Sequence, residues 1–174
     1  MAKKSLVEIM NESFTKLGSS RKIEKIEEIP ALAIETRVLQ EKRIMVVDDV
    51  KSLLVFFAPY FIAATGGEVS FVYFEKETLE ELVDKILKEN PEIVLLDYNL
   101  STKVKGNTVC QELKNRAFGG LVYGFSSINT KEEFLKAGAT GFVPKNTVDP
   151  DYTIELLAKY VKELDDAHQL HKPN

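Results

Sequence analysis

The stretch EIVLLDYNL, residues 92–100, is an apolar run that ends in a carboxylate, Asp97. A run this apolar is typical of a strand that is covered on both faces, as strands in a parallel sheet are. RIMVVD, residues 43–48, has the same character and ends in Asp48, which is followed by Asp49. These two stretches predict an α/β fold in which acidic side chains follow buried strands.

After residue 43 the chain alternates strand-like runs with helical patterns. The other strand-like runs are EVSFVYF (68–74), GLVYGF (120–125) and GFVP (141–144). Signals for helix starts follow three of the runs. Thr78–Glu81 and Thr130–Glu133 fit capping boxes, and Asp149–Pro150 fits a cap with a first-turn proline. Five βα units in order predict a doubly wound five-stranded parallel sheet with helices on both faces.

The composition argues against several classes of protein. The 174 residues include 44% hydrophobic residues and carry a formal net charge of −4, with lysines and arginines scattered among acidic residues. This pattern lacks the basic stripe that is typical of nucleic-acid binding. The N-terminus lacks the apolar core of a signal peptide, so we expect a cytoplasmic protein. The single cysteine, Cys110, excludes an intrachain disulfide and fits a helix position in the core.

Residues 53–64, LLVFFAPYFIAA, form an apolar run in the first helix after the first strand. The run is too short to span a membrane, which takes ~20 residues, and it needs more cover than one sheet face provides. Pro59 should kink or interrupt this helix. Residues 1–42 are expected to form a helical N-terminal extension that supplies the cover, within one chain or exchanged in a homodimer. The alternative is a flexible leader.

The remaining boundaries follow from this division. Residues 43–165 are expected to form the main domain, and residues 166–174 a polar C-terminal tail in which His168 and His171 are solvated.

Polar residues follow four of the predicted strands, and they are Asp48, Asp49, Asp97, Ser126, Ser127 and Lys145. In an open α/β sheet, ligands bind beyond the carboxyl ends of the strands. Carboxylates that cluster there repel one another unless a cation neutralises them, and magnesium suits such oxygen ligands. Lysine and serine can hold a phosphoryl group, and aspartate can be phosphorylated. The simpler alternatives are that Asp48 and Asp49 cap a helix and that the serines are turn residues.

Four motifs within residues 43–165 resemble the receiver domain of two-component response regulators. They are VVDD (46–49), LLDYN (95–99), GFSS (124–127) and AGATGFVPK (137–145). The resemblance implies the flavodoxin-like strand order 2-1-3-4-5, for which a receiver of this family is a standard example.

The resemblance also implies roles for single residues. Asp97 would accept a phosphoryl group from a histidine kinase or a histidine phosphotransfer protein. The implied magnesium ligands are Asp49, Asp97, Asp48 through a water, and the backbone carbonyl of Asn99. Lys145 would pair with the phosphoryl group, Ser126 would move toward it, and Phe142 would be the aromatic residue that switches when Ser126 moves.

The chain departs from the receiver pattern in three places. Ser101 replaces a usual proline, and Gly106 comes one residue later than the usual glycine. Asn146 follows Lys145 in place of a proline whose peptide bond is usually cis, so this bond should be trans or strained. The stretch from Ser126 to Lys145 is shorter than usual, which should shorten the loop or helix on the output face.

We therefore expect a stand-alone receiver, which is not an enzyme apart from catalysing its own phosphoryl transfer and hydrolysis. It would signal by changing its contacts with a downstream protein, without nucleic-acid binding or membrane insertion. The alternative is a non-phosphorylated, receiver-like module for interaction or dimerisation. A phosphohydrolase is disfavoured, because Asn99 stands where such enzymes carry a second aspartate.

Overall fold

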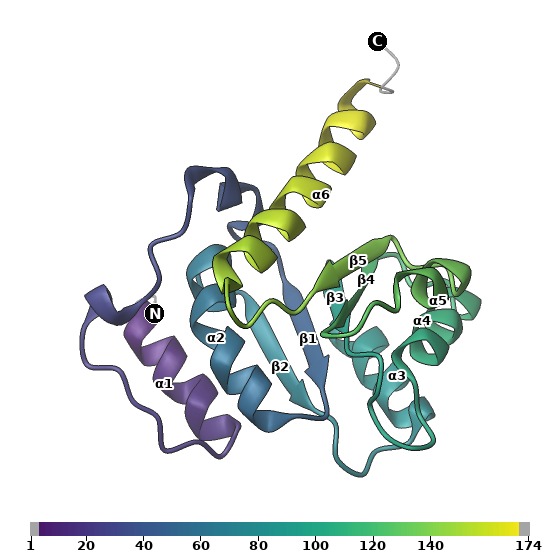
Figure 1. Ribbon diagram of the computed structural model, residues 1–174, viewed down its shortest axis with the longest axis horizontal. Coiled ribbons are helices and arrows are strands. Elements are labelled where there is room, and N and C mark those ends of the chain that lie inside the picture. The colour runs from purple at the N-terminus through teal and green to yellow at the C-terminus, as the bar shows by residue number, and fades with distance from the viewer. Residues whose placement is uncertain (1–3, 171–174) are drawn as a thin grey trace.

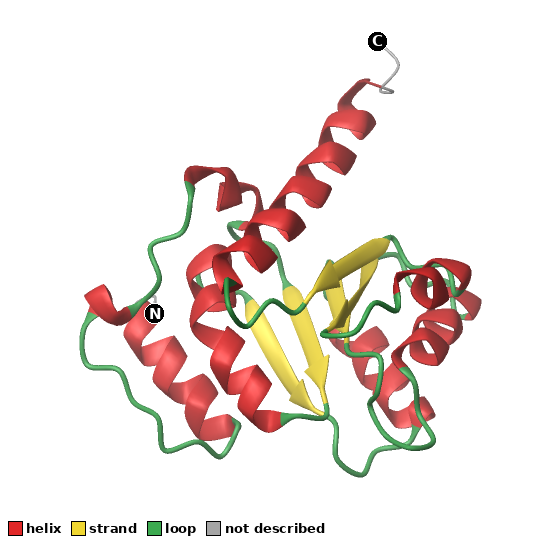
Figure 2. Ribbon diagram, in the orientation of Figure 1, coloured by secondary structure: helices red, strands yellow, loops and turns green. Residues whose placement is uncertain are grey.

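The computed structural model describes residues 4–170 of the chain, which fold around one parallel sheet (Figures 1 and 2). The strands are β1 (Ile44–Asp48), β2 (Val69–Tyr73), β3 (Ile93–Leu96), β4 (Leu121–Ser126) and β5 (Gly141–Pro144). The α-helices are α1 (Leu6–Lys16), α2 (Lys51–Thr65), α3 (Leu79–Glu89), α4 (Gly106–Asn115), α5 (Lys131–Lys136) and α6 (Pro150–Leu170). Two short 3₁₀ helices, η1 (Ile26–Glu28) and η2 (Ile34–Leu39), connect α1 to β1.

All neighbouring strands in the sheet run parallel, in the order β2-β1-β3-β4-β5. This confirms the predicted fold class and strand order. The register places Val47 beside Leu96, Leu96 beside Gly124, and Ser126 beside Pro144. The carboxyl ends of β1, β3, β4 and β5 therefore meet at one edge of the sheet.

Side chains of the central strands alternate between two cores, one on each face of the sheet. Met45 and Val47 face the helices α3, α4 and α5, together with residues such as Val94 and Leu96. Ile44 and Val46 face α2 and α6. Because both faces are covered, β1 and β3 are buried at every position, which explains their continuous apolar sequences.

The N-terminal extension packs on α2 within the same chain, and α1 lies beside α2 in Figure 1. Met10 and Phe14 of α1 are fully buried against Ala58 and Ile62 of α2. Other α2 residues, including Phe57 and Phe61, face the sheet. The apolar run is thus buried on two sides, and the prediction that the extension covers it is confirmed.

Pro59 lies inside α2 without interrupting the helix. Proline has no backbone N–H, so the carbonyl of Val55, four residues earlier, loses its usual helical donor. The guanidinium of Arg21 donates to this carbonyl at 3.4 Å and also lies 5.1 Å from the centre of the Phe14 ring. A residue of the extension therefore supplies the hydrogen bond that Pro59 cannot make.

The three predicted helix starts have different outcomes. Thr78 and Glu81 form the predicted capping box, and the carboxylate of Asp149 accepts the N–H of Tyr152 at 3.2 Å. The capping box at Thr130 is wrong, because the Thr130 side chain makes no cap hydrogen bond. Capping residues normally have extended backbone, whereas Thr130 has φ −114° and ψ 25°.

The C-terminal helix is longer than predicted. Residues 166–170, expected in a tail, continue α6, which has no glycine or internal proline to end it. His168 is exposed, as expected, whereas His171 lies outside the described residues. Cys110 is fully buried in α4, and burial raises its pKa to about 11. Within residues 4–170, no helix combines the length and the apolar character needed to cross a membrane.

Candidate functional site

Three carboxylates meet at the carboxyl edge of the sheet. Asp48 ends β1, Asp49 follows it, and Asp97 follows the neighbouring strand β3. Each of the three offers an oxygen that lies within 4.8 Å of the other two. Asp48 and Asp97 are buried, and Asp49 is partly exposed. The parallel pairing of β1 with β3 brings together residues that lie about fifty positions apart in the sequence.

Lys145 joins two of these carboxylates. Its Nζ lies 2.5 Å from Oδ2 of Asp48 and 2.5 Å from Oδ1 of Asp97. The Lys145 side chain is only 2% exposed, and its Nζ also lies 5.2 Å from the centre of the Phe125 ring. Because β5 ends beside β4, the backbone N–H of Lys145 donates to the carbonyl of Ser126 at 3.0 Å. The pairing of β5 with β4 thus fixes the backbone of Lys145 at the carboxyl edge of the sheet.

Backbone N–H groups hold the carboxylates from the loop side. Oδ2 of Asp97 accepts the N–H of Asn99 at 2.7 Å, and Oδ1 of Asp48 accepts the N–H of Val50 at 2.9 Å. Val50 is the capping position of α2, and no side chain caps this helix. Asp48 and Asp49 are therefore not the helix caps that were considered as an alternative.

The site carries more negative than positive charge. Asp48, Asp49 and Asp97 face one buried cation, Lys145. Burial raises the pKa of Asp48, and the Lys145 charge offsets part of this effect. Burial, followed by repulsion from Asp97, also raises the pKa of Asp49. Ionisation of Asp49 is therefore less favourable in this site than in water.

This donor set fits magnesium. Magnesium prefers a small number of carboxylates and keeps several waters, and Asp49 is open to solvent on one side. Asp49 and Asp97 are the carboxylates that would hold the ion, with Asp48 behind them engaged by Lys145. The carbonyl of Asn99, the fourth implied ligand, lies in the loop after β3, where the Asn99 N–H already binds Asp97.

We expect Asp49→Asn to stabilise the metal-free protein at neutral pH. A carboxylate whose folded pKa is raised destabilises the fold once ionised, so its removal should raise Tm by roughly 1–3 °C after allowance for solvent screening. The same variant should lose most of the Tm increase that saturating magnesium gives the wild type. Thermal unfolding with and without magnesium measures both effects.

The matched control is Asp166→Asn, which changes an exposed carboxylate on α6. A full magnesium response in Asp49→Asn would exclude this residue as a ligand.

Ser126 and Phe142 occupy neighbouring strands close to the site. Ser126 is the last residue of β4 and is buried, whereas Ser127 is exposed. Phe142 is 8% exposed, and the centre of its ring lies 6.4 Å from the centre of the Phe134 ring on α5. Phe142 is thus a core residue in this structure, and its role as a switch stays a prediction.

The glycine that comes one residue late, Gly106, begins α4. Its N–H donates to the carbonyl of Tyr98 at 2.8 Å, which closes the loop after Asp97. A Cβ at Gly106 would collide with the backbone carbonyl of Asp97.

We expect Gly106→Ala to lower the free energy of unfolding by about 1–3 kcal/mol, because backbone has to shift to admit the methyl group. Urea unfolding measures this loss. Gly119→Ala is the matched control, since a Cβ there has no neighbour within 4 Å. Equal stability of the two variants would show that the loop tolerates the methyl group.

Two further departures from the receiver pattern have structural counterparts. There is no cis peptide bond among the described residues, so the Lys145–Asn146 bond is trans. The short stretch between Ser126 and Lys145 leaves α5 with 6 residues, in agreement with the expected shortening of this face.

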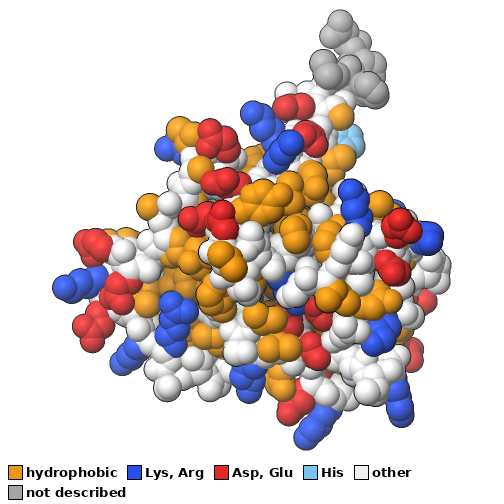
Figure 3. Space-filling model, viewed as in Figure 1, with side chains coloured by type: hydrophobic (Ala, Val, Ile, Leu, Met, Phe, Trp, Pro, Cys, Tyr) orange, Lys and Arg blue, Asp and Glu red, His pale blue; other side chains and the backbone are white. Residues whose placement is uncertain are grey.

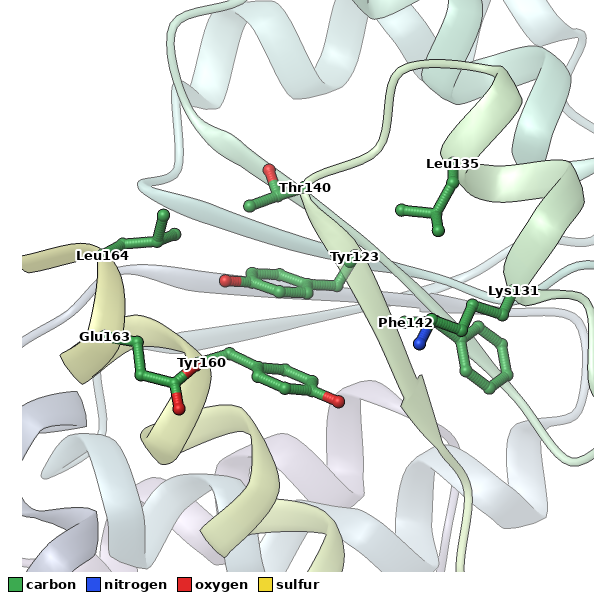
Figure 4. Close-up of a pocket in the computed structure, with 9 residues that line it drawn as sticks. Tyr123, Lys131, Leu135, Thr140, Phe142, Tyr160, Glu163 and Leu164 are labelled. Carbon is green, nitrogen blue, oxygen red and sulfur yellow. The ribbon is translucent and has the colours of Figure 1, made fainter. Parts of the chain in front are cut away.

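A cavity of about 280 Å³ lies away from the carboxylates, along β5 between α5 and α6 (Figure 4). The rings of Tyr123 and Tyr160 stack there at 6.2 Å, and Phe142 and Leu135 also line the cavity. Burial raises the pKa of Tyr123 to about 12. On the face that Figure 3 shows, basic and acidic side chains are mixed around the periphery, and hydrophobic side chains gather in the middle. The cavity is mainly an aromatic and apolar surface beside the switch candidate, and it holds none of the acidic site residues.

No protein-family model matches this sequence, and no curated protein matches it either. Solved structures do match. The receiver domain of NtrX from Brucella abortus has a TM-score of 0.56 and 23% identity, over 68% of this chain and 98% of that chain. The BeF3-activated N-terminal receiver domain of RstA from Klebsiella pneumoniae has a TM-score of 0.55 and 23% identity, over 68% and 97%.

The receiver domain of the histidine kinase CKI1 from Arabidopsis thaliana has a TM-score of 0.56 and 15% identity, over 79% of this chain and 99% of that chain. These similarities show that the chain has the fold of response regulator receiver domains.

Proposed function

We propose that this protein is a phosphorylatable receiver that accepts a phosphoryl group on Asp97 with the help of magnesium. The observation that carries the proposal is the buried Lys145, which contacts Asp48 and Asp97 within a cluster of three carboxylates. A buried lysine with clustered carboxylates is costly for stability alone, because a single buried cation leaves net negative charge. Phosphoryl transfer uses both features, since the carboxylates can hold a cation and the lysine can pair with phosphoryl oxygens.

In the proposed reaction, a carboxylate oxygen of Asp97 attacks the phosphorus of the donor. A new O–P bond forms, and the P–N bond of a phosphohistidine breaks, after which the imidazole nitrogen takes up a proton. Magnesium would supply positive charge for the phosphoryl oxygens. Lys145 would exchange its contact with the Asp97 carboxylate for one with a phosphoryl oxygen, and the Asn99 N–H would keep the carboxylate oriented.

The consequence of phosphorylation would be a change in protein contacts. Ser126, at the end of β4, would move toward the phosphoryl group, and Phe142 on β5 would respond. The surface formed by α5, β5 and α6 contains the aromatic cavity beside Phe142, so a downstream protein could bind this surface differently in the two states. The phosphoryl donor would be a histidine kinase or a histidine phosphotransfer protein in the cytoplasm.

The test is incubation of the full chain with magnesium and acetyl phosphate, followed by intact-mass spectrometry. We expect one phosphoryl adduct, and we expect none in the presence of a chelator. Beryllofluoride, which mimics a bound phosphoryl group, should raise Tm in the presence of magnesium. No adduct and no response to beryllofluoride would favour a receiver-like module that acts without phosphorylation.

A further inference from the structure

The loop between Asp97 and α4 is closed by hydrogen bonds into a small hairpin. Beyond the bond from Gly106 to Tyr98, Asn99 and Lys105 form an antiparallel bridge, and the Ser101 N–H donates to the Val104 carbonyl at 3.0 Å. The Ser101 hydroxyl, which stands in place of a proline, accepts the N–H of Val104 at 2.9 Å. This closure places residue 105 opposite residue 99.

The side chain of Lys105 reinforces this pairing. Its Nζ donates to Oδ1 of Asn99 at 2.8 Å and lies 5.9 Å from the centre of the Tyr98 ring. Lys105 is half-buried, whereas Lys103 at the tip of the same hairpin is exposed, and its Nζ makes no hydrogen bond within residues 4–170. The two lysines of this loop therefore differ in their surroundings.

Asn99 connects this lysine to the reactive carboxylate. Its backbone N–H donates to Oδ2 of Asp97 at 2.7 Å, while its side chain accepts from Lys105. Asn99 itself is exposed, so the core does not hold it in place. We propose that Lys105 is a positioning residue that holds Asn99 so that the Asn99 N–H keeps Asp97 in the orientation needed for attack.

An alternative role for Lys105, direct attraction of the phosphoryl donor, would have different consequences. An ammonium group close to the open side of the site could attract an anionic donor directly, and its removal would then weaken donor binding. Positioning through Asn99 instead affects the reactivity of bound donor and depends on the Asn99 side chain. The structure favours positioning, because the Lys105 ammonium already has Asn99 as its partner.

The first measurement is hydrogen exchange of the Asn99 backbone N–H by NMR, which needs no phosphoryl donor. We expect Lys105→Met to speed this exchange about two- to tenfold, the range given by one hydrogen bond. Lys103→Met should leave it unchanged, and Lys105→Arg should restore it because arginine still donates. Exchange in Lys105→Met that equals exchange in Lys103→Met would overturn the proposal.

The second measurement rests on the proposed function and follows adduct formation with acetyl phosphate at saturating magnesium. Lys105→Met should lower the maximal rate roughly two- to tenfold, again the range for one hydrogen bond, without changing the half-saturating acetyl phosphate concentration. In an Asn99→Ala background, Lys105→Met should cause no further loss.

The outcomes of the two measurements separate the proposals. A higher half-saturating concentration, with normal exchange of the Asn99 N–H, would mean that Lys105 meets the donor directly, and would overturn the positioning role. Absence of an adduct in the wild type would contradict the proposed function, while the exchange measurement would still decide whether Lys105 holds Asn99.

Discussion

Asp97→Asn should abolish the phosphoryl adduct completely. The carboxamide keeps the size of the side chain and can still accept the Asn99 N–H, but its oxygen is a far weaker nucleophile than a carboxylate. The neighbouring Asp48 cannot replace it, because Asp48 is 1% exposed and its Oδ2 contacts Lys145. Intact-mass spectrometry after incubation with magnesium and acetyl phosphate gives the result directly.

The control for this experiment is Asp166→Asn, which makes the same chemical change at an exposed position on α6. It should form the adduct to the same extent as the wild type. Circular dichroism of Asp97→Asn would establish that the variant is folded. An adduct in Asp97→Asn at the wild-type level would place the acceptor on another residue and contradict the assignment.

Lys145→Met should lower the free energy of unfolding by about 3–5 kcal/mol in the absence of magnesium, and should also prevent efficient adduct formation. The substitution removes the cation between Asp48 and Asp97 and leaves two buried carboxylates without a positive charge beside them, which is the costly way to break a buried ion pair. Urea unfolding at neutral pH measures the loss. Lys159→Met, at an exposed position on α6, should change stability little.

The stability loss in Lys145→Met should depend on pH. Burial already raises the pKa of Asp48, and removal of the Lys145 charge should raise it further. A carboxylate with a raised folded pKa opposes folding when ionised, so the deficit should shrink as the pH falls through that pKa. Adding Asp48→Asn should recover part of the stability at neutral pH. A loss within ~1 kcal/mol of wild type, as for exposed ion pairs, would contradict the burial of this lysine.

The sequence predicted the sheet because hydrophobic periodicity and strand ends are local signals. The runs at residues 43–48 and 92–97 are apolar since both faces of their strands are covered, and β1 and β3 lie within them. Asp48, Asp49, Asp97 and Lys145 were identified because parallel strands bring their carboxyl ends to one edge.

The features that were missed depend on tertiary geometry. Thr130 has the right spacing for a capping box, but its backbone is not extended. Its hydroxyl is buried and has no hydrogen-bond partner in the part of the chain that the structure describes. Lys105 has no sequence motif that marks it, because its contact with Asn99 exists only once the loop closes as a hairpin. The late position of Gly106 was the available signal, since it adds one residue to this loop.

Arg21 and Pro59 show that the segment with receiver motifs is shorter than the segment that folds as one unit. The motifs that resemble receivers lie within residues 43–165, yet α2 within that range relies on a guanidinium from residue 21 and on the apolar side chains of α1. A fragment trimmed to the receiver-like boundaries would expose the α1-facing side of α2 to water and leave the Val55 carbonyl without its donor. Expression fragments should therefore retain the N-terminal segment, and the chain should melt in a single cooperative transition.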